Sequence, residues 1–179
     1  MSGLRVRLLA AGQGKRAGGP KAWGPYDGKT LLEAQVGFLA TVTAPENIDI
    51  AIQEEWLDRC RDLSPRVNWV TADPEGEALA SLQALLKATA RARSFVIHVD
   101  MPVFDLRVWR TLAASPGDAV PVHKGRRGHP VLLTAATLDA VARLDPATGR
   151  LDEFLRGRVV TEVPAPTDMI LVNLNEARE

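Results

Sequence analysis

The chain has 179 residues, of which 46% are hydrophobic and 25% are charged, as in an ordinary globular domain. Its 22 Lys and Arg residues balance 22 Asp and Glu residues, which argues against nucleic-acid binding through bulk charge. A single cysteine, Cys60, excludes a disulfide framework and a cysteine-rich zinc site, and no apolar run approaches the ~20 residues of a membrane span. We therefore expect one cytoplasmic domain over residues 1–179, with neither a nucleic acid nor a membrane as partner.

Strands and helices alternate along the first 115 residues. The segment 94–100 (SFVIHVD) is a continuous apolar run, typical of a central strand that is buried on both faces, and we expect His98 within it to be a core histidine with satisfied hydrogen bonds. The alternation predicts an α/β fold in three layers around a mostly parallel, doubly wound (Rossmann-like) sheet. The predicted strands are 4–10, 47–53, 66–72 and 94–100, and the predicted helices are 30–42, 54–63, 77–92 and 106–115.

The pattern becomes less regular after residue 123. Pro164 and Pro166 indicate a sheet edge or a turn, because proline cannot donate a ladder hydrogen bond. We expect this half to add a small antiparallel excursion over the carboxyl ends of the parallel strands. The predicted elements are a strand at 118–123, a loop and strand at 125–134, a helix at 135–144, and strands at 158–165 and 168–173.

The strongest local signal follows the first strand, where residues 8–24 read LLAAGQGKRAGGPKAWG. Glycine lets the backbone approach a ligand closely, so that successive N–H groups converge on phosphate oxygens. Arg16 offers a planar fork for phosphate and Lys21 a compact charge. The sequence therefore predicts a phosphate-binding loop at the carboxyl end of the first strand, where doubly wound sheets bind ligands.

Three other interpretations of this loop fit less well. A dinucleotide-binding loop has the spacing GxGxxG and leads directly into a helix, whereas Gly12, Gly14 and Gly18 are spaced GxGxxxG and Gly19-Pro20 follows. A P-loop needs Ser or Thr after Gly-Lys, and here Arg16 follows Lys15. A solvated loop would not explain so many glycines and cations in so short a stretch.

The stretch LAAGQGKRAGGPK (9–21) resembles the signature LAAGxGxRxGxPK of nucleotidyltransferases with the nucleotide-diphospho-sugar transferase fold. It is most similar to the small enzymes that attach GMP or CMP to molybdopterin, the MobA-like NTP transferases. The resemblance implies that this loop covers a triphosphate, with Arg16 and Lys21 on its phosphates as catalytic residues. By the same match, the nucleotide would be bound by Leu9, Ala10, Ala11, Gly12, Gly14 and Lys15.

An aspartate ends the buried strand before residue 101, in VIHVDMPVF (96–104). Asp100 at a strand's carboxyl end is suited to Mg²⁺, which prefers oxygen ligands and takes few of them from the protein. The alternative is that Asp100 caps the next helix or turn. The resemblance favours the metal, because the family has a DxP motif here whose aspartate binds it.

A second metal ligand is expected near the end of the sequence, in LVNLNEARE (171–179). The family has an NxNTPEDL-like or DxDTPED-like stretch there, and its first Asn or Asp completes the metal site. That match assigns Asn173 as the second Mg²⁺ ligand, although the Thr-Pro of the motif is absent. The alternative is that Asn173 caps a helix or turn.

Two more segments are similar to binding segments of the family. ADPEGEALASLQALL (72–86) resembles its nucleobase and ribose segment, with Asp73, Gly76 and Ser81 as candidates; the alternative is a helix N-terminus with Asp73 before Pro74. KGRRGHPVLL (124–133) resembles the acceptor segment of the cytidylyl branch, with Gly128, His129 and Pro130 matching. The basic residues beside it would receive a phosphorylated acceptor or form a solvated turn; they are Lys124, Arg126 and Arg127.

The implied function is transfer of a nucleoside monophosphate from an NTP, CTP or GTP, to a phosphorylated acceptor of the molybdopterin kind, with release of pyrophosphate. Mg²⁺ is the implied cofactor, and the protein is a monomer or a homodimer. A sugar phosphate is the next acceptor. The alternative class is a non-catalytic nucleotide-binding or regulatory module of the same fold, which the altered stretch around Asn173 favours.

Overall fold

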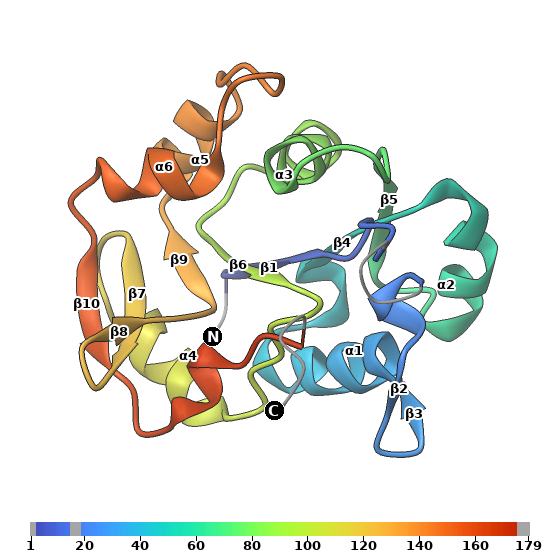
Figure 1. The fold of residues 1–179 in the computed structure, drawn as a ribbon, viewed down its shortest axis with the longest axis horizontal. Helices are drawn as coiled ribbons and strands as arrows, with labels where there is room; N and C mark the ends of the chain where they lie inside the picture. The colour runs from blue at the N-terminus through green and yellow to red at the C-terminus, as the bar shows by residue number, and fades with distance from the viewer. Residues whose placement is uncertain (1–2, 15–18, 175–179) are drawn as a thin grey trace.

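The computed structural model of the chain describes residues 3–14 and 19–174 (Figure 1). Its strands are β1 (Arg5–Leu9), β2 (Pro25–Tyr26), β3 (Lys29–Thr30), β4 (Ile48–Ile52), β5 (Asn68–Thr71), β6 (Ser94–His98), β7 (Ala119–His123), β8 (Arg126–Arg127), β9 (Val131–Leu133) and β10 (Thr161–Pro164). Its helices are α1 (Leu31–Val42), α2 (Leu57–Leu63), α3 (Ala78–Ala88), α4 (Leu106–Ala113), α5 (Ala135–Val141) and α6 (Leu151–Arg156). Short 3-10 helices are η2 (Lys21–Trp23), η3 (Pro45–Asn47), η4 (Glu54–Trp56) and η5 (Asp168–Leu171).

One mixed sheet organises the described residues, in the strand order β10-β7-β9-β6-β1-β4-β5, with β8 pairing beside β7. The four strands β6, β1, β4 and β5 are parallel. β9 is antiparallel to β6 and to β7, and β10 lies at the edge, parallel to β7. The predicted mostly parallel α/β sheet with a small antiparallel part is confirmed, as is the edge indicated by the prolines.

Helices cover both faces of the sheet, which gives three layers. Figure 1 shows α3, α5 and α6 above the sheet and α1 and α4 below it. Side chains alternate along β1, so that Val6 and Leu8 join the core on the α1 side and Leu9 joins the core on the α3 side. Because both faces are covered, the central strands read as apolar runs in the sequence.

A charged network is buried at the amino end of the sheet, on its α3 side. Arg7 and Asp49 are paired across β1 and β4, and neither residue is exposed to solvent. The Nη1 of Arg7 lies 3.2 Å from Asp49 Oδ2, and its three guanidinium nitrogens also donate to Ser94, Thr89 and the carbonyl of Ala90. This network fixes β1, β4, α3 and β6 to one another.

Two predicted elements need correction. The strand expected over 168–173 is wrong, because residues 168–171 form η5; Thr167 caps it by accepting from the N–H of Met169. Within this 3-10 turn Ile170 is buried, and its carbonyl accepts from the N–H of His129. The helix expected over 77–92 stops at Ala88, where the chain extends toward the buried network.

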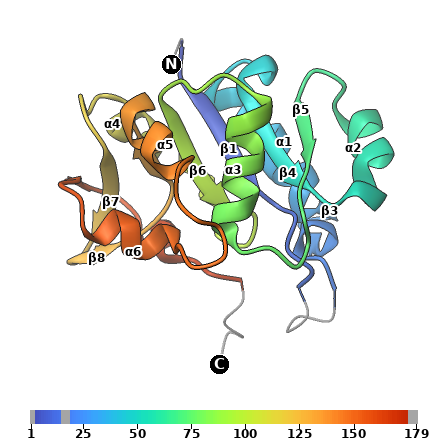
Figure 2. The ribbon, with the colours of Figure 1, turned by 90° about the horizontal axis from the view of Figure 1, so that it is seen from above.

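The loops that follow the parallel strands gather at one edge of the sheet. Figure 2 shows β1 and β6 running toward the same edge of the sheet. The N–H of Val99, after β6, donates to the carbonyl of Leu9, at the end of β1, over 3.0 Å. The helices within the described ranges include none that combines the length and the hydropathy needed to cross a membrane.

Candidate active site

The glycine-rich loop begins where β1 leaves the sheet. Gly14 has a φ of +63°, and a Cβ there would lie 1.8 Å from the carbonyl oxygen of Gly19, so only glycine fits. The N–H of Gly19 donates to the carbonyl of Gly14 over 3.3 Å, which brings the two ends of the loop together. Lys15 and Arg16, the predicted cations within the loop, lie outside the described residues.

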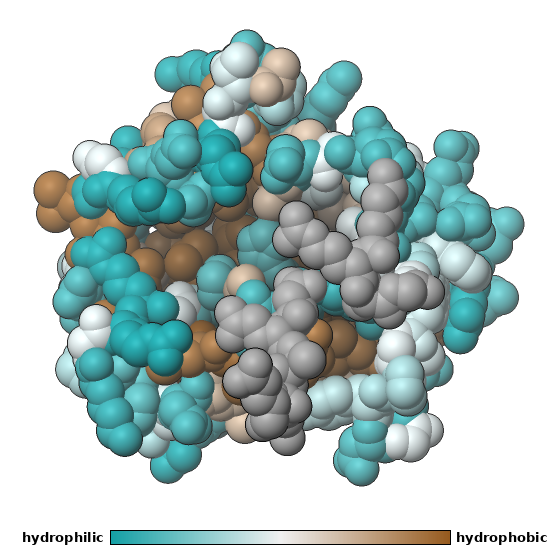
Figure 3. All heavy atoms as spheres, in the orientation of Figure 1, coloured by the Kyte–Doolittle hydropathy of each residue, from teal (hydrophilic) through white to brown (hydrophobic). Residues whose placement is uncertain are grey.

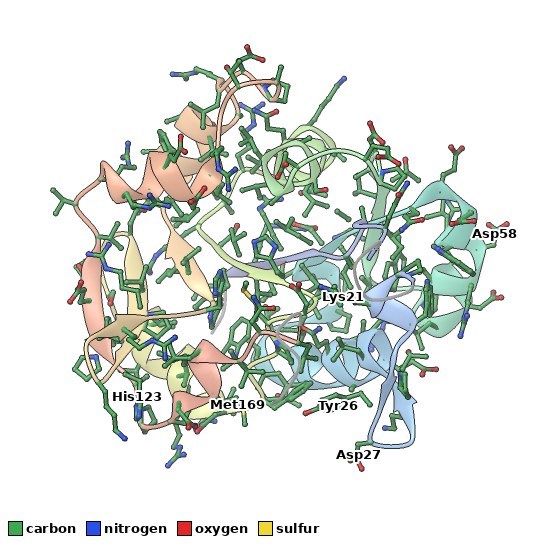
Figure 4. All side chains as sticks on the ribbon, in the orientation of Figure 1. Lys21, Tyr26, Asp27, Asp58, His123 and Met169 are labelled. Carbon is green, nitrogen blue, oxygen red and sulfur yellow. The ribbon has the colours of Figure 1, made fainter. Side chains whose placement is uncertain are left out.

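Lys21 begins the short helix η2 immediately after the loop. Its Nζ donates to Oδ2 of Asp100 over 3.1 Å, and each of the two side chains is 16% exposed. Figure 4 shows Lys21 near the middle of the visible face, far from the labelled Asp58 and His123 on either side. The loop from β1 and the turn after β6 therefore place a cation and a carboxylate together, as the sequence predicted for their shared site.

Hydrogen bonds from α1 and within the chain fix the turn after β6, and with it the position of Asp100. The buried side chain of Gln35 on α1 donates to the carbonyl of Val99 over 2.6 Å, and the N–H of Met101 donates to the carbonyl of His98. Asp100 does not cap α4, because that helix is capped by the side chain of Asp105. The helix part of the capping alternative for Asp100 is therefore excluded for α4.

The C-terminal segment packs against the same turn. The N–H of Leu174 donates to the backbone carbonyl of Asp100 over 2.8 Å, so Asn173 is one residue before a backbone contact with the turn of Asp100, although it does not line the loop cavity. Upstream, the carbonyl of Ile170 accepts from the N–H of His129, and a Cβ at Gly128 would lie only 2.2 Å from that carbonyl oxygen. Gly128 therefore permits the close docking of η5, which brings Asn173 to the site.

A cavity of about 150 Å³ lies beside Lys21 and Asp100, and we call it the loop cavity. It is lined by Leu9, Gly12, Gly14, Lys21, Gly76, Ala78, Ser81, His98, Val99 and Asp100. Apart from Ala78, His98 and Val99, all of these were predicted site residues. The loop after β1, the start of α3 and the turn after β6 thus converge on one small cavity.

Several predicted residues lie around this cavity rather than in its wall. Ala10 and Ala11 are buried at the root of the loop. Asp73 lines a separate cavity, and its Oδ1 accepts from the N–H of Glu75 over 2.9 Å, which shapes the turn before α3. Glu75 in turn accepts from the side chain of Gln13, so a hydrogen bond of 2.5 Å joins this turn to the glycine loop.

The basic residues of 124–127 lie on the hairpin formed by β7 and β8. Arg127 donates to Glu162 on the edge strand β10 over 2.8 Å, and Lys124, Arg126 and Arg127 are exposed and absent from the wall of the loop cavity. The structure therefore does not bring this cluster to Lys21 and Asp100. The next three residues come closer to Lys21 and Asp100, because they contact η5; they are Gly128, His129 and Pro130. Pro130 is buried and is joined to His129 by a cis peptide bond.

A second cavity, of about 310 Å³, adjoins the first, and we call it the histidine cavity. Its apolar wall is formed by Leu79, Val96, Val131, Leu151 and Leu155. Its polar lining is formed by Glu77, His98, His129, Arg150 and Asp152, and it shares Ala78 and His98 with the loop cavity. In Figure 3 a hollow with a hydrophobic floor and a hydrophilic surround lies below the α6 region.

The two histidines of this cavity stand edge to face, with ring centroids 5.6 Å apart. Burial lowers the pKa of His98, and burial together with the neighbouring His98 lowers the pKa of His129 to about 4. Both imidazoles are therefore uncharged at pH 7. Among the described residues, only the third histidine, His123, has a ring nitrogen in a hydrogen bond, Nδ1 to the carbonyl of Ala165.

Sequence reasoning missed much of this second cavity. His98 was expected to be a satisfied core histidine, and it instead lines both cavities without a hydrogen-bond partner in the described part of the chain. Helix α6 was not predicted, although Leu151, Phe154 and Leu155 have the i, i+3, i+4 spacing of a helix packed on one side. The helix is only six residues long, so this signal is weak.

The oxygen donors suit a hard cation such as Mg²⁺. Asp100 offers a carboxylate, and Asn173, next in sequence to the Leu174 contact, offers an amide oxygen. The described residues contain no group of three or more His, Cys, Asp or Glu arranged to hold a metal ion. A small donor set of this kind fits Mg²⁺, which usually takes one or two protein oxygens and completes its shell with water and substrate phosphates.

Comparison with known proteins identifies a matching family. The sequence pattern described as "MobA-like NTP transferase domain" matches residues 6–163 of the chain. The molybdenum cofactor cytidylyltransferase of Escherichia coli (strain K12) is 22% identical over 183 residues, covering 95% of each protein. The bifunctional protein GlmU of Neisseria meningitidis serogroup C (strain 053442) is 32% identical over 124 residues, which cover 65% of this chain but only 26% of GlmU.

Solved structures share the fold. The crystal structure of Rv0371c from Mycobacterium tuberculosis H37Rv superposes with a TM-score of 0.75 at 22% identity, covering 90% of this chain and 87% of that one. A structure of Rv0371c in complex with manganese superposes with a TM-score of 0.73 at 19% identity, covering 92% and 89% of the two chains. At this level of identity, the likeness shows a common fold of the nucleotide-diphospho-sugar transferase type.

Proposed function

The chain belongs to the MobA-like NTP transferase family, and on that premise we propose that it transfers a nucleoside monophosphate from CTP or GTP to a phosphorylated acceptor of the molybdopterin kind. The observation that carries the proposal is the pairing of Lys21 with Asp100 at 3.1 Å on the wall of the loop cavity, next to Gly14. The similarity to the molybdenum cofactor cytidylyltransferase over 95% of both chains supports this choice of nucleotide and acceptor.

In this proposal the glycine loop and the start of α3 hold the nucleotide. Backbone N–H groups around Gly12 and Gly14 approach the phosphates, together with Lys15 and Arg16 of the same loop. Gly76 and Ser81 also line the loop cavity, and the nucleoside would be placed against them. Asp73 acts from the turn before α3, which is joined to the loop through Gln13 and Glu75.

The reaction is an in-line displacement at phosphorus. An oxygen of the acceptor phosphate forms a bond to the α-phosphorus of the NTP, while the bond from that phosphorus to the bridging oxygen of the β-phosphate breaks and pyrophosphate leaves with the electron pair. A phosphate monoester is already largely ionised at pH 7, so no protein base is needed. Lys21 stabilises the negative charge that develops on the phosphates.

A divalent cation, Mg²⁺, would be held by Asp100 and Asn173 and would neutralise charge on the bound phosphates. The manganese complex of Rv0371c supports a divalent cation in this fold. The acceptor would bind on the side of the histidine cavity. The segment that faces this cavity is positioned by Gly128, His129 and Pro130. Catalysis then depends on positioning and electrostatics rather than on a covalent intermediate.

The proposal is tested by pyrophosphate release. The protein is incubated with Mg²⁺, with CTP or GTP, and with molybdopterin or glucose 1-phosphate, and pyrophosphate is measured over time. We expect release with molybdopterin and one of the two nucleotides. Tight nucleotide binding without release from any pair would instead identify a non-catalytic nucleotide-binding module, and release only with glucose 1-phosphate would identify a sugar-phosphate nucleotidyltransferase.

A further inference from the structure

The segment that follows β4 contacts both ends of the glycine loop. At the start of the loop, the buried side chain of Gln53 donates from its Nε2 to the carbonyl of Gly12 over 3.3 Å. At the end of the loop, the ring of Trp56, in η4, packs against the ring of Trp23, in η2, with the two centroids 5.3 Å apart. One short stretch of chain therefore supports the glycine loop where it leaves the sheet and where it returns.

The short helix η2, which contains Lys21, has little stability of its own. It has three residues, and no side chain caps its N-terminus. It is closed by backbone hydrogen bonds, from the N–H of Trp23 to the carbonyl of Pro20 and from the N–H of Gly24 to the carbonyl of Lys21. A single 3-10 turn forms few hydrogen bonds for the dihedral angles that it fixes, so its position depends on packing.

Two side chains of η2 supply that packing. Ala22 is fully buried, and Trp23 is partly buried against the core on the α1 side. The guanidinium carbon of Arg59, on α2, lies 3.9 Å from the centroid of the Trp23 ring, a distance at which the face of the ring attracts a cation. Figure 1 shows α2 beside the segment that leads from the glycine loop to β2. The ring of Trp23 is therefore the part of η2 that contacts both η4 and α2.

The indole N–H groups of Trp23 and Trp56 are buried, and neither has a hydrogen-bond partner in the part of the chain that the structure describes. Buried donors ordinarily find acceptors. Because these two do not, contacts of the rings rather than hydrogen bonds set the orientation of both side chains. The attachment of η2 to the segment after β4 therefore depends on the two rings and on the cation of Arg59.

We propose that these three side chains, which we call the aromatic clamp, position Lys21 by fixing η2 to the segment after β4. The clamp consists of Trp23, Trp56 and Arg59. The Nζ of Lys21 lies 3.1 Å from Oδ2 of Asp100 on the wall of the loop cavity, whereas no clamp residue is part of that wall. The clamp acts on the reaction through Lys21, so this inference rests on the proposed function, in which the charge of Lys21 acts on the phosphates.

A double-mutant cycle with Lys21 distinguishes positioning from general support of the fold. With Mg²⁺, molybdopterin and CTP or GTP, Arg59→Ala should lower the kcat of pyrophosphate release about threefold, as loss of one exposed cation–π contact predicts. The same change in a Lys21→Met background should have no further effect, because the group that the clamp positions is already gone. Arg59→Lys keeps a cation over the ring and should restore most of the rate.

The matched control for Arg59 is Arg61→Ala, which removes the same charge from an exposed position on the same helix and should leave the rate unchanged. The rings are tested at Trp56. Trp56→Phe should retain the rate, because the indole N–H that it removes has no partner within the described residues. Trp56→Ala removes the ring itself and should lower the rate about tenfold through misplacement of η2. Circular dichroism confirms that each variant is folded.

The position of Lys21 is also measured without the reaction. Acetic anhydride acetylates accessible lysine amines, and mass spectrometry gives the rate at Lys21, which is 16% exposed, relative to the exposed Lys29. Arg59→Ala should raise this ratio about threefold, because the Lys21 amine then leaves its contact with Asp100 more often. Arg61→Ala should leave the ratio unchanged.

The outcomes are separable from those of the proposed function. An active wild-type protein in which Arg59→Ala and Trp56→Ala keep the full rate would overturn the positioning role and leave nucleotide transfer intact. The same conclusion follows if Arg59→Ala lowers the rate as much in the Lys21→Met background as in the wild type, or if the acetylation ratio does not change. A wild-type protein that releases no pyrophosphate would overturn the proposed function, whereas a raised acetylation ratio would still show that the clamp holds Lys21 in place.

Discussion

The two ends of the parallel sheet both contain charged and polar side chains, but these side chains differ in burial and in hydrogen bonding. At the amino end, Arg7 and Asp49 are fully buried, and their polar atoms have partners on β6 and in the segment that follows α3. At the carboxyl end, Lys21 and Asp100 remain partly exposed on a cavity wall, and the rings of His98 and His129 have no hydrogen bond from the described residues. Fully buried polar groups ordinarily find partners, as they do at the amino end, which is therefore structural; at the carboxyl end the polar side chains line a cavity that a ligand can enter.

The largest expected effect is on stability, from breaking the network at the amino end. Asp49→Asn leaves the guanidinium of Arg7 buried without a counter-charge, and removing one partner of a buried ion pair costs about 3–5 kcal/mol of unfolding free energy. Urea unfolding measures this loss. The control is Asp58→Asn, whose exposed pair with Arg61 should leave the unfolding midpoint unchanged; equal stability of both variants would remove the contrast between the two ends.

The next effect is on activity, from the charges at the carboxyl end. Lys21→Met and Asp100→Asn should each lower the rate of pyrophosphate release by about 10²–10³-fold, as loss of one electrostatic contact to a transition state typically does. Their pair is partly exposed, so the unfolding free energy should change by less than about 1 kcal/mol. Lys29→Met, in the short β2–β3 hairpin, is the matched control and should retain full activity.

Docking of the C-terminal segment should affect both stability and activity. Gly128→Ala introduces a Cβ 2.2 Å from the carbonyl oxygen of Ile170, and the resulting overpacking should cost about 1–3 kcal/mol. Because η5 brings Asn173 to Asp100, the same variant should also weaken Mg²⁺-dependent nucleotide binding in calorimetry. Gly117→Ala has free space around its Cβ and an ordinary φ, so it should change neither quantity.

The last effect is on the pH dependence of stability. The folded pKa of His129 is lowered to about 4, below the ordinary value of 6.5, so the unfolded chain binds a proton that the folded chain does not. Unfolding free energy should therefore fall as the pH drops from about 6.5 to about 4, and His129→Gln should flatten this slope. His123→Gln, with its ring hydrogen-bonded to Ala165, serves as the control; an unchanged slope in His129→Gln would show that the imidazole is not kept neutral by the fold.

The sequence predicted the parallel core well because the physical signal there is local. Gly14, Lys21 and Asp100 each follow or end a buried strand, and strands that run parallel bring such residues to the same edge. The strand containing Asp49 was also predicted, but its polar residue faces the α3 core rather than water. Only the pairing of β1 with β4 shows that Arg5 and Arg7 both lie against it.

The rest of the site depends on contacts that no local pattern contains. His98 lies in an apolar strand, and its role becomes visible only when His129, from the antiparallel part, stands against it. Leu151 and Leu155 close the cavity from a helix too short to give a clear periodic signal. The apolar run around Ile170 was predicted as a strand, whereas its docking on His129 requires a 3-10 turn.

The central claim is that the residues at the carboxyl end of the parallel sheet transfer a nucleotide. One measurement tests this claim most directly. In a single-turnover experiment, CTP or GTP labelled at the α-phosphate is mixed with excess protein, Mg²⁺ and molybdopterin, and the position of the label is followed. The account predicts that the label moves to the acceptor while unlabelled pyrophosphate leaves in equal amount. Label that stays on bound CTP and GTP, or that becomes attached to the protein, would contradict it.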